Sequence, residues 1–162
     1  DPEDQLASTP QDFTSGQVLT AVMMDKLPQG VLDFQSSTSN SSATSSTSEL
    51  TLLTASALTP AQSSRRWKLK FHARGTQATV AADTFVFRFK ESGATINEFH
   101  YITAAGSSVT IDGIELEHIL TPTVAAHTYS VVVARATGTG TLTTLGTATA
   151  PMFLYVEDVG SA

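Results

Sequence analysis

The sequence predicts an antiparallel all-β sandwich of the jelly-roll type, and three observations carry this prediction. About eight segments alternate apolar and polar residues, and they recur at intervals of roughly ten residues, which is typical of short strands in sandwiches. No long amphipathic helix is visible between these segments. No segment repeats at a fixed period, which argues against a propeller or a solenoid.

The clearest alternation lies in the middle of the chain, in the segments Arg65–Arg74 and Thr84–Lys90. Both place large apolar side chains at every second position, with charged or polar residues at most of the positions between them, so each is expected to bury one face. Thr95–Thr103 is a further strand, with Phe99 and Tyr101 on one face. The expected core residues of the two clearest strands are Trp67, Leu69, Phe71, Ala73, Phe85, Phe87 and Phe89.

The C-terminal stretch predicts three consecutive strands, Thr128–Arg135, Thr141–Thr149 and Met152–Val156. The last of these is apolar on both faces: Met152, Leu154 and Val156 form one row, and Phe153 and Tyr155 form the other. A sandwich has one core to cover one row, so the second row needs another layer, and a further copy of the chain is its simplest source. Phe153 and Tyr155 are the candidate interface row, because aromatic residues are enriched at interfaces. The alternative is that a short helix expected over Ala21–Leu27 covers this row within one chain.

The segment from Val109 to Leu120 changes the phase of its alternation. Val109 and Ile111 occupy odd positions, whereas Ile114 and Leu116 occupy even ones. Asp112-Gly113 lies at the change, where either a β-bulge or a hairpin turn would absorb it. The bulge is the favoured interpretation, because Val109–Ile111 is short for a separate strand.

The N-terminal region predicts less structure. Residues 1–35 are expected to form a polar arm with one short helix, Ala21–Leu27, whose Leu19, Met23 and Leu27 repeat at helical spacing. This helix either covers an open end of the sandwich or serves as an attachment device. Residues 36–48, rich in Ser and Thr, predict a flexible linker or a polar edge strand. Residues 49–162 are then the sandwich domain, which we expect to fold without the arm.

Composition excludes several classes of function. Apolar residues make up 41% of the chain, charged residues 15%, and the formal net charge is -6. So acidic a chain is a poor ligand for nucleic acid or for an anionic membrane surface. The absence of cysteine excludes disulfides and thiolate chemistry. No apolar run approaches the roughly 20 residues of a membrane span, so membrane insertion is not expected.

Motifs that carry catalytic chemistry are absent from the sequence. The nucleophile elbow, the phosphate-binding loop and the dinucleotide fingerprint do not occur. Of the four histidines, His118 shares the apolar face of Leu116 and Leu120; it is expected in the core or at a chain interface, with an ion site on a trimer axis as the less favoured alternative. Tyr101 and Tyr155 could stack on sugars, although a core or interface position is favoured. We therefore expect no enzyme, no cofactor and no metal.

Several blocks of sequence resemble a group of bacteriophage virion proteins, often called minor tail proteins. The blocks are FTSGQVLTA and MDKLPQGVL near the start, FRFKESGATI, LTPTVAAHTYSVVVARATGTGTL, and PMFLYVEDVG near the end. The resemblance spans residues 13–160. It implies a compact jelly roll similar to the trimeric C1q- and TNF-like heads of fibre tips. It carries no catalytic residues.

The resemblance and the double-faced terminal strand favour a structural virion protein that forms the homotrimeric head of a tail fibre or tail tip. The expected partners are two further copies, other virion proteins through the N-terminal arm, and a host-surface receptor or glycan. A capsid decoration or head-fibre protein is the first alternative. A carbohydrate-active enzyme or a secreted C1q/TNF-like binding module is the second.

Overall fold

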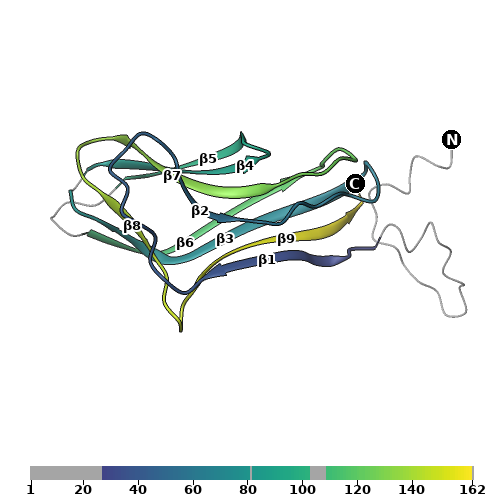
Figure 1. Cartoon of the computed structure of the whole chain (residues 1–162), viewed down its shortest axis with the longest axis horizontal. Coiled ribbons are helices and arrows are strands. Elements are labelled where there is room, and N and C mark those ends of the chain that lie inside the picture. The colour runs from purple at the N-terminus through teal and green to yellow at the C-terminus, as the bar shows by residue number, and fades with distance from the viewer. Residues whose placement is uncertain (1–26, 81, 103–108, 162) are drawn as a thin grey trace, which may run out of the picture.

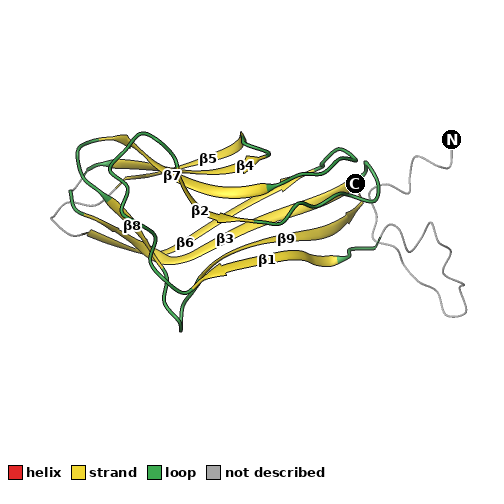
Figure 2. Ribbon diagram, viewed as in Figure 1, coloured by secondary structure: helices red, strands yellow, loops and turns green. Residues whose placement is uncertain are grey.

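The protein, described by a computed structural model for residues 27–80, 82–102 and 109–161, folds into two antiparallel sheets packed face to face (Figure 1). Within these residues every regular element is a strand, so the described part of the chain contains no helix that could cross a membrane (Figure 2). The strands are β1 (Gly30–Ser37), β2 (Leu50–Thr54), β3 (Arg65–Ala78), β4 (Thr84–Glu91), β5 (Ala94–Ile102), β6 (Val109–Leu120), β7 (Tyr129–Thr137), β8 (Leu142–Leu145) and β9 (Met152–Ser161).

The strand order is that of a jelly roll. The first sheet has the order β1-β9-β3-β6, with β8 also paired to β3, and the second sheet has the order β2-β7-β4-β5. The first strand thus lies beside the last and the second beside β7, so the chain wraps both ends around the same core. β8 and β9 share one edge of β3, β9 along Arg65–His72 and β8 along Gly75–Ala78. The predicted antiparallel sandwich is confirmed.

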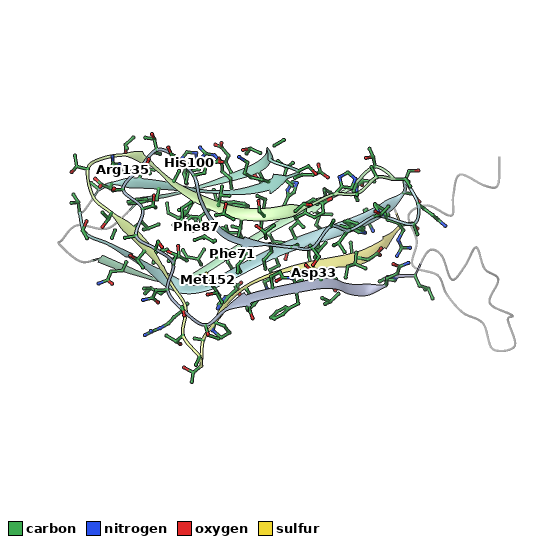
Figure 3. All side chains as sticks on the ribbon, in the orientation of Figure 1. Asp33, Phe71, Phe87, His100, Arg135 and Met152 are labelled. Carbon is green, nitrogen blue, oxygen red and sulfur yellow. The ribbon has the colours of Figure 1, made fainter. Side chains whose placement is uncertain are left out.

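The core lies between the sheets and is formed by the alternating residues of the central strands. Phe71 of β3 and Phe87 of β4 stack across the core with ring centroids 6.4 Å apart, and both point into the space between the sheets with Met152 (Figure 3). All seven core residues expected from the two clearest strands are buried. Tyr101 also faces inward, since its ring meets Phe87 edge-on at 5.5 Å, and burial raises the pKa of its hydroxyl.

The expected bulge at Asp112-Gly113 is wrong. β6 pairs with β3 in one unbroken register, from Trp67 opposite Leu120 to Ala78 opposite Val109. The phase change is instead shared by both strands, because β3 also switches the positions that it buries, from Ala73 to Thr76. No extra residue is therefore inserted into β6. Gly113, at the change of phase, has a φ of +72°, a left-handed backbone conformation that favours glycine.

The C-terminal strands differ from the prediction in length. The strand expected over Thr141–Thr149 ends at Leu145, because Thr147 and Ala150 close a tight turn with Thr147 N–H donating to the Ala150 carbonyl at 2.9 Å. The last strand runs on to Ser161, opposite Arg65 of β3.

The expected end of the arm, at residue 35, falls inside a strand. β1 lies in the first sheet, antiparallel to β9, so the sandwich begins near Gly30 and not at residue 49. The Ser/Thr-rich segment that follows is neither a free linker nor a full strand: Thr44 N–H donates to the Leu142 carbonyl at 2.8 Å, which places the segment along β8. Apart from Leu27, the expected helix lies outside the described residues.

Candidate functional site

The candidate site is the outward face of the first sheet, which we call the aromatic face. Four strands contribute to it, because β9 pairs with β1 and β3, and β3 pairs with β6. Each level of the sheet holds one residue from β1, β9, β3 and β6 in turn. The three levels are Ser36, Phe153, His72 and Glu115; Phe34, Tyr155, Lys70 and Glu117; and Val31, Glu157, Lys68 and Ile119.

β9 separates its two apolar rows as the sequence predicts. Met152, Leu154 and Val156 are buried in the core, with at most 1% of each side chain exposed. Phe153 and Tyr155 lie on the opposite side and are half-buried. The sandwich core therefore covers the aliphatic row, and the aromatic row lies on the outer surface of the sheet.

Aromatic rings on this face stack on one another. The Phe153 ring lies 5.0 Å from His72, 5.8 Å from Phe34 and 6.1 Å from Tyr155, with interplanar angles of 23°, 29° and 16°. Rings in this arrangement turn their faces toward each other. Phe34, at the free edge of the sheet, remains 55% exposed.

The other half of the aromatic face is charged. Lys68 pairs with Glu157 at 2.6 Å, and this hydrogen bond raises the pKa of the Lys68 ammonium. Glu115 lies 3.8 Å from Lys70 and 3.5 Å from His72. Two lysines and three glutamates give the face a formal charge of -1, against -6 for the whole chain.

Exposed aliphatic residues lie at both edges of the aromatic face. Val31 on β1 is 59% exposed and Ile119 on β6 is 53% exposed. The face thus presents apolar surface at its two margins and around the ring stack, with ion pairs between them. Protein interfaces combine apolar and polar surface in this way.

The structure brings together some of the predicted site residues and not others. Phe153 and Tyr155 are neighbours on the aromatic face. His118 is not part of it: it faces the sandwich interior at the edge of β6, opposite Leu69, and its Nδ1 lies 3.1 Å from Asn97 Nδ2. Alternation along β6 places His118 on the same side of the strand as Leu116 and Leu120, as the sequence predicts.

The predicted attachment residues lie mostly beyond the described part of the chain. Leu19 and Met23 fall outside it, and Leu27 is half-buried at the start of the described chain, where its carbonyl accepts a hydrogen bond from Arg65 Nη2 at 2.8 Å. Phe34, Val31, His72 and Ile119 were not predicted as site residues. The first two lie in residues 30–37, where the alternation of apolar and polar residues is broken and gives only a weak strand signal.

Among the described residues no three His, Asp or Glu side chains lie together in a way that could hold a metal ion.

The fold and the site define a class: an antiparallel jelly-roll sandwich with a half-apolar, half-charged outer face on one sheet. Comparison with models of known families gives no match, and no curated protein matches the chain.

Proposed function

We propose that the chain is a non-enzymatic structural protein of a tailed-phage particle, where three copies form the head of a tail fibre or tail tip that contacts the host surface. The phage assignment is supported by the sequence blocks described above. The main support for a trimer is the aromatic face, which places Phe34, Phe153 and Tyr155 on one surface. Among the described residues, Val31, Phe34 and Ile119 of this surface remain exposed, and exposed apolar surface often marks a contact with another protein.

The ring arrangement favours a protein partner over a sugar at this face. Sugars stack on the open face of an aromatic ring, whereas the rings around Phe153 turn their faces toward one another. The exposed apolar groups of this face are much of Phe34 and the aliphatic side chains of Val31 and Ile119. Such a surface is suited to close packing against another protein surface.

Charge supports a second copy of the chain as that partner. Copies of a chain with a net charge of -6 repel each other, and the repulsion is smallest where the charge is nearly balanced. The aromatic face is such a place, since Lys68 and Lys70 offset most of its glutamates. Its two margins differ, with Phe34 at one and Ile119 at the other, which suits a head-to-tail contact that closes into a ring.

The orientation of the chain supports attachment at one end and host contact at the other. The described chain begins and ends at the same end of the sandwich, from which the N-terminal segment would reach other virion proteins (Figure 1). The connections that follow β3 and β7 lie at the opposite end and carry exposed hydroxyls, such as those of Thr79 and Thr139. Hydroxyl groups suit hydrogen bonding to a host glycan.

Labelling of intact phage particles tests the proposal. Gold-labelled antibodies against the purified protein should mark the tail in electron micrographs. Labelling of heads would favour the capsid decoration alternative, and particles without label would overturn a virion role. Release of sugars from host cell-wall polysaccharide by the purified chain would contradict the non-enzymatic assignment.

A further inference from the structure

A buried ion pair joins three segments at the end of the sandwich where the chain enters. Arg65 opens β3 and Asp158 lies near the end of β9, and both side chains are 1% exposed. Arg65 Nε donates to Asp158 Oδ2 at 2.8 Å, and Arg65 Nη2 donates both to Asp158 Oδ1 and to the Leu27 carbonyl at 2.8 Å. Asp158 Oδ1 also accepts from Gly160 N–H at 2.9 Å. The segment before β1 is thus tied to two strands of the body.

β1 enters the first sheet directly after this pair. It lies antiparallel to β9, from Gly30 opposite Asp158 to Ser37 opposite Met152. Hydrogen bonds between antiparallel strands run perpendicular to the strands. A pull on the chain before β1, directed along the strand, therefore shears all the bonds of this ladder together. The stack of Phe34 on Phe153 lies within the same ladder and resists the same sliding.

We propose that β1 and the Arg65–Asp158 pair form a force-bearing junction between the N-terminal segment and the sandwich. This inference rests on the proposed attachment through that segment. When the head is held at the opposite end and the N-terminal segment is pulled, the ladder between β1 and β9 carries the load as a unit. The junction is therefore strong in the direction in which a fibre tethers a particle to its host.

The same junction is weak in a second direction. Gly30 and Asp158 are paired at the entry end, and Ser161 lies at that end too. A pull that separates the N-terminal from the C-terminal side of the chain opens the ladder one pair at a time, starting with the contacts of Arg65. Bonds that break in sequence need less force than bonds that must break together, so the structure predicts a mechanical asymmetry.

Single-molecule pulling on the full chain tests the asymmetry. The sequence has no cysteine, so Ala148→Cys provides a unique handle in the exposed connection before β9. With one handle at the N-terminus, the second is placed either at position 148 or at the C-terminus. At equal loading rates, where forced unfolding follows the unfolding rate, the first pair should need a several-fold higher force. Equal forces would overturn the proposal.

Substitution of Arg65 tests the role of the ion pair. Arg65→Met should lower the unfolding force, most clearly with handles at the two termini, whereas the matched control Arg88→Met removes the surface pairing with Glu98 and should leave it unchanged. If Arg65→Met does not fold, Arg65→Lys retains the positive charge opposite Asp158 without the planar fork that also holds the Leu27 carbonyl. Equal losses in the Arg65 and Arg88 variants would contradict the junction.

These measurements use isolated chains, so they are independent of the virion assignment. A symmetric force response would refute the junction and leave the labelling of phage particles as it stands. Particles without label, together with an asymmetric response, would refute the virion role and leave the mechanical property of the fold.

Discussion

Phe153 and Leu154 are adjacent in the chain and face opposite sides of the same sheet. Leu154 is fully buried between the two sheets, whereas Phe153 lies half-buried on the aromatic face against His72 and Phe34. One strand therefore supplies both the core of the sandwich and the surface that we propose for assembly. Substitutions in the two rows should have separable effects, because each row loses a different partner.

Removal of the aromatic row should dissociate the assembly and preserve the fold. The double change Phe153→Ser, Tyr155→Ser deletes apolar surface from the aromatic face and leaves Leu154 in the core. We expect the mass in light scattering to fall to that of one chain, with β-type circular dichroism unchanged. The matched control Leu154→Ser should instead cost about 2–5 kcal/mol of folding stability. An unfolded double variant would mean that Phe153 and Tyr155 stabilise the single chain.

Phe87 should contribute more to folding than any aromatic residue of the outer face. Its side chain is fully buried and packs against Phe71 and Tyr101. Phe87→Ala should reduce the free energy of unfolding by about 3–5 kcal/mol in urea titrations. Tyr155→Ala, measured in chains already dissociated by Phe153→Ser, should cost well under half as much. A loss below about 1 kcal/mol for Phe87→Ala would contradict its core position.

Acid should weaken the fold through Asp158. Burial alone would raise the pKa of its carboxyl, but the hydrogen bonds from Arg65 and Gly160 outweigh burial and hold the pKa below its ordinary value. Because the unfolded chain then binds the proton first, the stability from this pair is complete above the ordinary Asp pKa of about 3.9 and is lost as the pH falls through the lower folded value.

Unfolding in urea between mildly and strongly acidic pH measures this dependence. The matched chain carries Arg65→Met with Asp158→Leu, which removes both charges and leaves no unpaired partner. The native chain should lose stability more steeply on acidification than the double variant. Parallel losses in the two chains would show that other carboxyls cause the acid sensitivity.

Truncation should locate the true start of the domain. A chain that begins at Leu27 keeps β1 and the carbonyl bound by Arg65, so it should unfold cooperatively at nearly the native temperature. A chain that begins at Glu49 lacks β1 and the segment along β8, which uncovers the edge of β9 and invites aggregation. Equal melting temperatures by circular dichroism would restore the expectation that residues 49–162 fold alone.

The sequence predicts those parts of the fold that depend on local alternation. Trp67, Leu69, Phe71 and Ala73 alternate with polar residues and are buried as expected, and so are Phe85, Phe87 and Phe89, although Val86 between them is buried as well. The sequence does not predict β1, because the register of its pairing with β9 shifts between Val31 and Asp33 and the alternation along the strand is broken there. The sequence shows that the alternation of β6 changes phase near Asp112-Gly113. It does not show that the paired strand β3 changes phase at the same level, which removes the need for a bulge.

The candidate site was predictable in part for the same reason. Two apolar rows in β9 already indicate that Phe153 and Tyr155 need a second layer. Phe34, His72 and Ile119 join them through the pairing of β1, β3 and β6, which are far apart in the chain. Such long-range registers leave no local signature in a single sequence, so the extent and charge of the aromatic face emerge from the structure.

The mass of the purified chain in solution tests the central claim most directly. Multi-angle light scattering after size-exclusion chromatography at micromolar concentration should give three times the chain mass of 17.1 kDa. If the double change Phe153→Ser, Tyr155→Ser then reduces the mass to that of one chain, the aromatic face lies between the copies, as proposed. A single species of 17.1 kDa across the accessible concentrations would contradict the account.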